Sequence, residues 1–127
     1  YTTAGVLDTS YGTGGRVNLN LGINEVANAV AIQSGKALVA GSATVAGTTQ
    51  FFITRLNSTG VLDVGFGTSG ITTTPIGDGA GASALGIQST GKIVLAGTAV
   101  VSGQVVFALT RYSSSGVLDT TFGSSGI

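Results

Sequence analysis

The sequence predicts an all-β protein made of two β-propeller-like blades, and three observations lead to this prediction. The chain of 127 residues contains 22 glycines, 43% hydrophobic residues and only 8% charged residues, a composition that favours a folded chain with many turns. The tetrapeptide Gly-Val-Leu-Asp begins at Gly5, Gly60 and Gly116, which sets a repeat of 55 to 56 residues. No segment has the apolar spacing of an amphipathic helix.

The repeat divides the chain into three parts. Residues 1–15 form the loop motif of a preceding unit, residues 16–70 form the first repeat, and residues 71–127 form the second repeat with the start of a third loop motif. The repeats differ in length by one residue at Thr90, in a predicted turn where an insertion is tolerated.

Each repeat is predicted to form four short strands. Residues 16–21 alternate apolar and polar side chains, which is typical of a strand with one face in water, and we place this strand at a sheet edge. Residues 27–33 and 37–43 are apolar on both sides and flank the dipeptide Ser34-Gly35. This pattern predicts a tight hairpin that is buried on both faces. Residues 50–57 form the next strand.

The arrangement of these strands indicates the architecture. Four antiparallel strands in each repeat, apolar in the middle and polar at one edge, describe a propeller blade packed between neighbouring blades. The small residues Ala29, Ala31, Ala40 and Gly41 are expected to let the sheets approach closely. The alternative is a β-sandwich of two four-stranded sheets.

Charged residues recur at equivalent positions of the repeats, which indicates a structural role. Arg55 precedes Asp63 by eight residues, and Arg111 precedes Asp119 by the same interval, so each pair can meet across its loop motif. We expect partly buried, bidentate arginine–carboxylate pairs. Asp8 is the equivalent aspartate of the first loop motif. A calcium site at the three aspartates is an alternative, but the converging oxygens that calcium needs are missing.

The composition excludes most chemistry. The chain has no cysteine and no histidine, so we expect no catalytic residue, no cofactor and no metal site. Glu25 and Asp78 are the only carboxylates that do not recur, and turn carboxylates are usually just solvated. The net charge is zero and the charged residues are scattered along the chain, so we expect no nucleic-acid partner. No apolar run is long enough for membrane insertion.

Recurring motifs resemble those of the bacterial delta-60 repeat family. They read Gly-x-Leu-Asp-x-x-(Phe/Tyr)-Gly-x-x-Gly, Gly-Lys-(Ile/Ala)-(Val/Leu)-x-Ala-Gly and Phe-x-(Ile/Leu)-Thr-Arg, and they cover nearly the whole chain. The resemblance implies propeller-like blades in an extracellular or cell-surface protein, and it implies no reaction. The chain departs from the family at Tyr11, which replaces a Phe, and at Ser34 and Thr90, where the turn often carries Asp.

The expected function is structural and non-enzymatic. We expect a repeat domain of an extracellular bacterial surface protein, or a subunit that assembles into a ring or filament. The alternative is a lectin-like or adhesin module that binds a surface glycan. Sugar sites typically use exposed aromatic side chains, but the chain has no tryptophan, and four recurring phenylalanines are expected in the core: Phe51, Phe66, Phe107 and Phe122.

The ends of the repeats predict how copies associate. Two blades cannot close a ring, and the second repeat ends at Ile127, which is equivalent to Arg16, so it lacks its own outer strand. We expect residues 16–21 of a neighbouring copy to fill that edge, head to tail. The residues of this assembly strand that carry the prediction are Arg16, Val17, Leu19 and Leu21.

Overall fold

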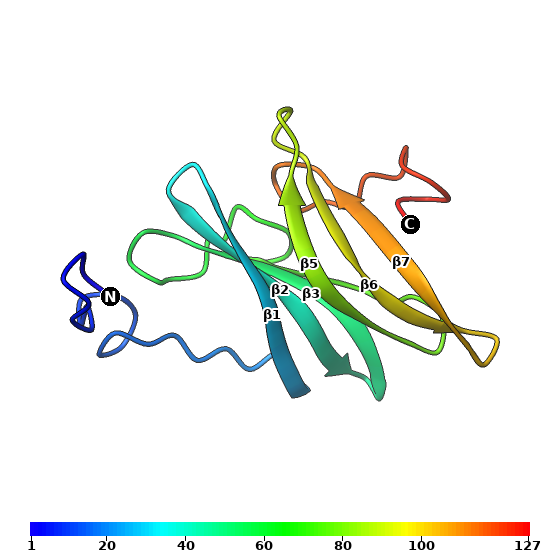
Figure 1. Ribbon diagram of the computed structural model, residues 1–127, viewed down its shortest axis with the longest axis horizontal. Helices are drawn as coiled ribbons and strands as arrows, with labels where there is room; N and C mark the ends of the chain where they lie inside the picture. The colour runs from blue at the N-terminus through cyan, green and yellow to red at the C-terminus, as the bar shows by residue number, and fades with distance from the viewer.

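The protein folds into two antiparallel sheets, as predicted. The computed structural model describes residues 1–127 and contains no helix, and therefore none that could cross a membrane. The first sheet, called blade 1, has the order β1-β2-β3-β4: β1 (Ile23–Gln33), β2 (Lys36–Val45), β3 (Thr48–Leu56) and β4 (Ile71–Thr74). The second sheet, called blade 2, has the order β5-β6-β7: β5 (Gly79–Ile87), β6 (Ile93–Val101) and β7 (Gln104–Tyr112). The sheets pack against each other and fan apart (Figure 1).

Each blade is a meander in which consecutive strands pair. This topology is that of a propeller blade, in contrast to the Greek-key connections of most β-sandwiches. The fourth strand of blade 1 comes from the second repeat, because β4 pairs with β3 from Phe51–Thr74 to Thr54–Ile71. Blade 2 has three strands, and no strand pairs with β7 on the side where β4 pairs with β3 in blade 1.

The predicted hairpin turn at Ser34-Gly35 is present, and a second turn of the same kind follows it. β1 and β2 are joined by Ser34 and Gly35 with φ of 50° and 77°, and Ala46 and Gly47 join β2 to β3 with φ of 51° and 84°. Two successive residues with positive φ give the type I′ turn, whose twist matches that of the flanking strands. The loop lengths therefore set the register of both hairpins.

The prediction that residues 27–33 are buried on both faces is wrong. β1 is an edge strand of blade 1, and Val30 and Ile32 are 69% and 67% exposed because no further blade packs against them. β2 and β3 are the interior strands and hold the buried side chains instead. Periodicity shows that a strand is apolar on both faces, but it does not give the strand's place in the sheet.

The main core lies between the blades. Leu38, Phe51 and Ile53 of blade 1 are fully buried in one cluster with Leu95 and Tyr112 of blade 2. Close approach is aided by small residues on β5, because a Cβ added at Gly81 would lie 3.3 Å from Cβ of Ser42. The blades therefore form a single packed unit.

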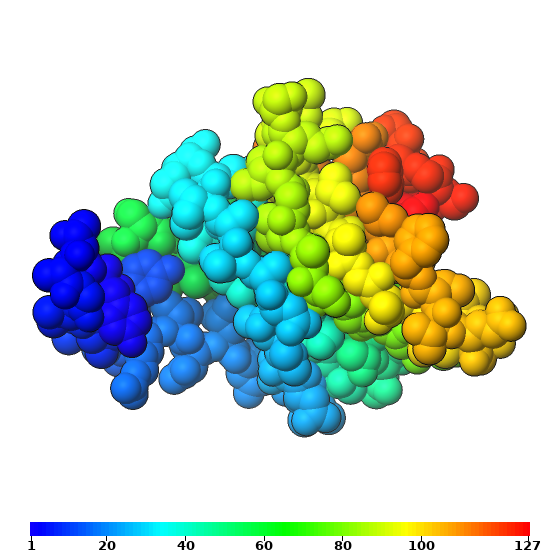
Figure 2. All heavy atoms as spheres, viewed as in Figure 1, coloured from blue at the N-terminus to red at the C-terminus, as the bar shows by residue number.

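Residues 16–21 do not form the predicted strand. Arg16 makes an isolated antiparallel bridge with Thr13, and residues 17–21 pair with no strand. It runs from the N-terminal loop, at one end of the molecule, to the start of β1 (Figure 1), and Figure 2 shows the loop projecting from the body of the protein.

Candidate assembly interface

An ion-pair cluster recurs in both blades and holds each loop motif. Arg55 Nε and Lys36 Nζ both donate to Oδ2 of Asp63, at 2.7 Å and 2.6 Å. The hydrogen bond from Lys36 is the largest of the interactions that lower the pKa of Asp63. The same cluster forms in blade 2, where Arg111 Nε and Lys92 Nζ both donate to Oδ2 of Asp119 at 2.8 Å. Lys92 likewise lowers the pKa of Asp119.

The expected bidentate geometry is wrong. Only Nε of Arg55 reaches the carboxylate, because Lys36 shares Oδ2 and NH1 of Arg55 turns toward other acceptors. NH1 donates to Oε1 of Gln33 and to the carbonyl of Ser114 in the loop after β7, each at 2.8 Å. The guanidinium also lies 4.7 Å from the ring centroid of Phe66. Arg55 thus connects the two blades as well as its own loop.

Asp8 differs from the other two aspartates because it forms no ion pair. Its Oδ1 accepts a hydrogen bond from the backbone N–H of Ser10 at 3.0 Å, and bonds with Ser10 lower its pKa. No group of three or more acidic, histidine or cysteine side chains is arranged to hold a metal ion. The three aspartates therefore act separately, one in each loop motif.

Side-chain hydrogen bonds across the blades were missed by the sequence analysis. Gln33 Nε2 donates to the carbonyl of Gly91 at 3.0 Å, and Asn28 Nδ2 donates to the carbonyl of Ala82 at 2.8 Å. The recurrence of glutamine at 33 and 88 was the available signal. Asn28 lies at a β-bulge between Ala27 and Ala29, which re-aims its side chain.

A second missed contact is a buried hydroxyl pair. The hydroxyls of Thr74 and Tyr112 are 2.7 Å apart and join β4 of blade 1 to β7 of blade 2. Burial raises the pKa of Tyr112. No repeat signal marks this pair, since the equivalent residues of the preceding unit are Leu19 and Leu56.

The loop motifs interlock from one blade to the next. The backbone N–H of Gly67 donates to the carbonyl of Ser115 at 2.8 Å, and the ring of Phe66 lies against Gly116. A Cβ at Gly116 would come within 2.6 Å of that ring, and its φ of 81° also favours glycine. The N-terminal loop docks on blade 1 in the same way. The N–H of Gly12 donates to the Thr59 carbonyl at 2.8 Å, and the ring of Tyr11 lies against Gly60.

The parts of the repeat that build this interface match a family model. Residues 33–66 and 88–122 each match the β-propeller domain of unknown function DUF5122, and together they span more than half of the chain. The chain belongs to the DUF5122 β-propeller family. Both matches run from the glutamine that bonds across the blades to the aromatic residue of the loop motif. No curated protein shows significant similarity to the chain.

The second DUF5122 unit carries the same interface groups, but there they contact no further blade. Phe107, the equivalent of buried Phe51, is 81% exposed, and Phe122 is only half-buried whereas Phe66 is fully buried. The expectation that Phe107 and Phe122 are core residues is therefore wrong in this chain. Gln88 and NH1 of Arg111 also make no hydrogen bond to another blade. We call this surface the open face of blade 2.

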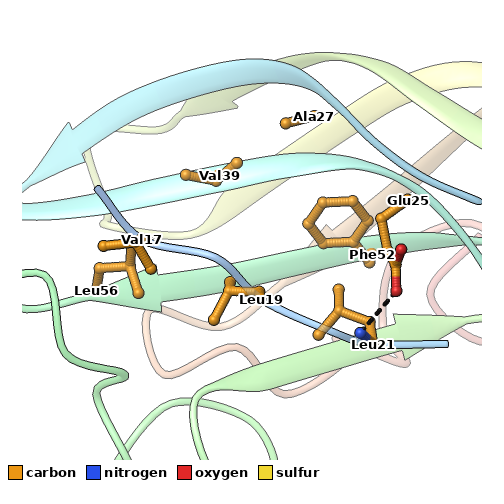
Figure 3. Close-up of a pocket in the computed structure, with 8 residues that line it drawn as sticks. All are labelled: Val17, Leu19, Leu21, Glu25, Ala27, Val39, Phe52 and Leu56. Carbon is orange, nitrogen blue, oxygen red and sulfur yellow. Dashed lines mark hydrogen bonds between the residues drawn. The ribbon is translucent and has the colours of Figure 1, made fainter. Parts of the chain in front are cut away.

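The outer face of blade 1 is covered by the segment of residues 16–21. Val17, Leu19 and Leu21 line an apolar hollow together with the blade 1 residues Val39, Phe52 and Leu56 (Figure 3). Phe52 and Leu56 are almost fully buried as a result. Three of the four residues expected to form an assembly strand thus face blade 1 of their own chain, and Arg16 is exposed.

Glu25 anchors this segment. Its Oε1 accepts the backbone N–H groups of Leu21 and Gly22 at 2.8 Å and 2.7 Å, and backbone hydrogen bonds lower the pKa of Glu25 (Figure 3 shows the bond to Leu21). Two backbone donors thus share one carboxylate oxygen of Glu25. Its role is to fix residues 16–21 at the outer face of blade 1.

Proposed function

We propose that the protein is a non-enzymatic structural module whose two outer faces bind further propeller blades. One observation carries the proposal: the groups that join blade 1 to blade 2 are present again on the open face of blade 2, where they contact no further blade. Gln88, Arg111 and Phe107 are the equivalents of Gln33, Arg55 and Phe51. A surface that repeats the donors and the apolar residues of an internal interface is suited to the same kind of partner.

The charged groups support a structural role over catalysis. Asp63 and Asp119 are held in ion pairs, and Glu25 is bonded to backbone N–H groups. The chain has no histidine or cysteine that could titrate near neutral pH. We propose no catalytic residue, cofactor or metal for this protein.

The setting we propose is the bacterial cell surface or the extracellular space. The loop and strand motifs resemble the delta-60 repeat, which is mostly associated with large surface or secreted proteins. In that setting the blades would form part of a ring or filament, made by neighbouring repeats or by copies of the chain. A ring forms if the rotation between successive blades adds up to a full circle, and a filament forms if it does not.

Two glutamines provide the test. Gln88→Ala removes a donor from the open face, so self-association should weaken about fivefold, in line with the loss of one hydrogen bond of about 1 kcal/mol, while the unfolding temperature stays unchanged. Gln33→Ala is the matched control, because it removes the bond to Gly91 and should lower the unfolding temperature instead. Sedimentation velocity and thermal unfolding measure the two effects. Unchanged association in Gln88→Ala would contradict the proposal.

A second candidate is a glycan-binding module, and one observation favours it. A polar hollow opens between the blades, and no hydrophobic residue lines it. Its lining residues are Gln33, Ser34, Lys36, Arg55, Gly91, Ser114 and Ser115. Its lack of aromatic residues and the pairing of Lys36 and Arg55 with Asp63 make it the weaker candidate. Calorimetric titration with neutral and acidic sugars tests it, and no binding at millimolar sugar would remove it.

A further inference from the structure

Blade 2 has an unfinished edge at β7. In blade 1 the equivalent strand, β3, is covered by β4, with the pairs Phe51–Thr74 and Thr54–Ile71 at the ends of the ladder. No strand covers β7 on this side.

The chain also contains a strand without a sheet. Residues 16–21 are equivalent to residues 71–76 of the repeat, and apart from an isolated bridge between Arg16 and Thr13 they pair with no strand. Glu25 and the apolar contacts of Val17, Leu19 and Leu21 hold them on the outer face of blade 1. β4, the fourth strand of blade 1, lies against blade 2 in an equivalent position, where Thr74 and the nearby Ile76 contact the core between the blades. Residues 16–21 therefore occupy the position that the fourth strand of a preceding blade would take against blade 1.

We infer that β7 takes residues 16–21 of a second copy of this chain as its fourth strand. The inference rests on the proposed function and specifies its partner. Transfer of the β3–β4 register places Phe107 opposite Leu19 and Thr110 opposite Arg16. In this register Val17 and Leu19 lie on the same face as Phe107 and Leu109, and this face packs against blade 1 of the second copy.

Side-chain chemistry directs the segment to this junction. In the internal junction Tyr112 faces Thr74, and the two hydroxyls bond each other. Leu19 in place of Thr74 would leave the buried Tyr112 hydroxyl without a partner, which is unfavourable. Leu19 fits opposite Leu56, its neighbour in the apolar hollow. In a pair of copies, blade 2 of one copy would precede blade 1 of the other in this way.

The N-terminal loop competes with the incoming copy. The N–H of Gly12 donates to the Thr59 carbonyl, just as the N–H of the equivalent Gly67 donates to the Ser115 carbonyl. Gly123 is the next equivalent glycine, so in an incoming copy its N–H would need the same Thr59 carbonyl. Association must therefore displace the docked loop of residues 1–15. Weakening that loop by Tyr11→Ala, which removes the ring lying on Gly60, should increase association.

Disulfide trapping in the full-length chain tests the register, and the absence of native cysteine makes any disulfide unambiguous. Leu19→Cys with Phe107→Cys places two thiols on directly opposed residues, within the separation that a disulfide needs. The matched control is Asn20→Cys with Phe107→Cys, because Asn20 points to the other face of the segment and is more exposed than Leu19. Thermal unfolding of the reduced variants checks that both fold.

Oxidised samples of the registered pair should form disulfide-linked dimers and longer species on non-reducing gels, at least about fivefold above the control. Adding Tyr11→Ala should raise the linked fraction, and a fall would contradict the displacement of the N-terminal loop. If neither pair forms dimers, or both do so equally, while light scattering still shows association of the unmodified chain, strand donation is overturned and face-to-face binding of blades stands. A chain that stays monomeric at every concentration overturns both.

Discussion

At the scale of single residues, the junction between the blades depends on buried polar groups that bond each other. Thr74 and Tyr112 are almost completely excluded from solvent, and each hydroxyl provides the other's partner. Tyr112→Phe should therefore destabilise the protein by about 1–2 kcal/mol, because it leaves the Thr74 hydroxyl unpaired. The double variant with Thr74→Val should recover most of the loss, as measured by denaturant unfolding. A double variant less stable than either single variant would contradict this account of the pair.

The aspartates of the loop motifs give the stability a pH dependence. Hydrogen bonds from lysine and arginine lower the pKa values of Asp63 and Asp119 in the folded chain. A lowered folded pKa means that the unfolded chain binds protons first as the pH falls, so the stabilisation is complete above about pH 5 and is lost progressively below about pH 4. Denaturant unfolding between pH 7 and pH 2 should show this decline, and Asp119→Asn should reduce its slope. A stability that rises on acidification would contradict the ion-pair assignment.

At the scale of strands, two equivalent phenylalanines provide a comparison within one chain. Phe51 on β3 is fully buried between the blades, and Phe107 on β7 is 81% exposed. Phe51→Ala should cost about 3–5 kcal/mol of folding free energy, since it opens a cavity in the core. Phe107→Ala should leave the unfolding free energy of the monomer nearly unchanged and weaken self-association. Equal destabilisation by both variants would show that Phe107 is not on an open face.

The strands also show which features the sequence could predict. The type I′ turns, the meander and the Arg55–Asp63 pairing follow from glycine positions, periodicity and repeat spacing, which are local or recurring signals. The exposure of β1 and the contacts of Arg55 with Ser114 depend on which blade lies beside which, and a single repeat does not contain that information. Residues 16–21 have a strand pattern, yet a strand needs a neighbour to complete its hydrogen bonds. The sequence pattern therefore describes the unit in its assembled setting.

At the scale of the whole molecule, the chain is one internal junction with two unequal ends. One end presents the exposed Phe107 and the unpaired Gln88 beside an uncovered strand edge, and the other presents an apolar face covered by residues 16–21. We propose that these ends are complementary, because each repeats one side of the junction between blades 1 and 2. Long uncovered strand edges and apolar faces favour association over a dispersed monomer.

The mass of the native particle tests this central claim most directly. Size exclusion coupled to light scattering should be run on the unmodified 127-residue chain over a wide range of concentrations. We predict masses at multiples of 12.4 kDa that grow with concentration until a ring closes or a filament forms. A particle of 12.4 kDa at every concentration, with a single cooperative unfolding transition, would contradict the account.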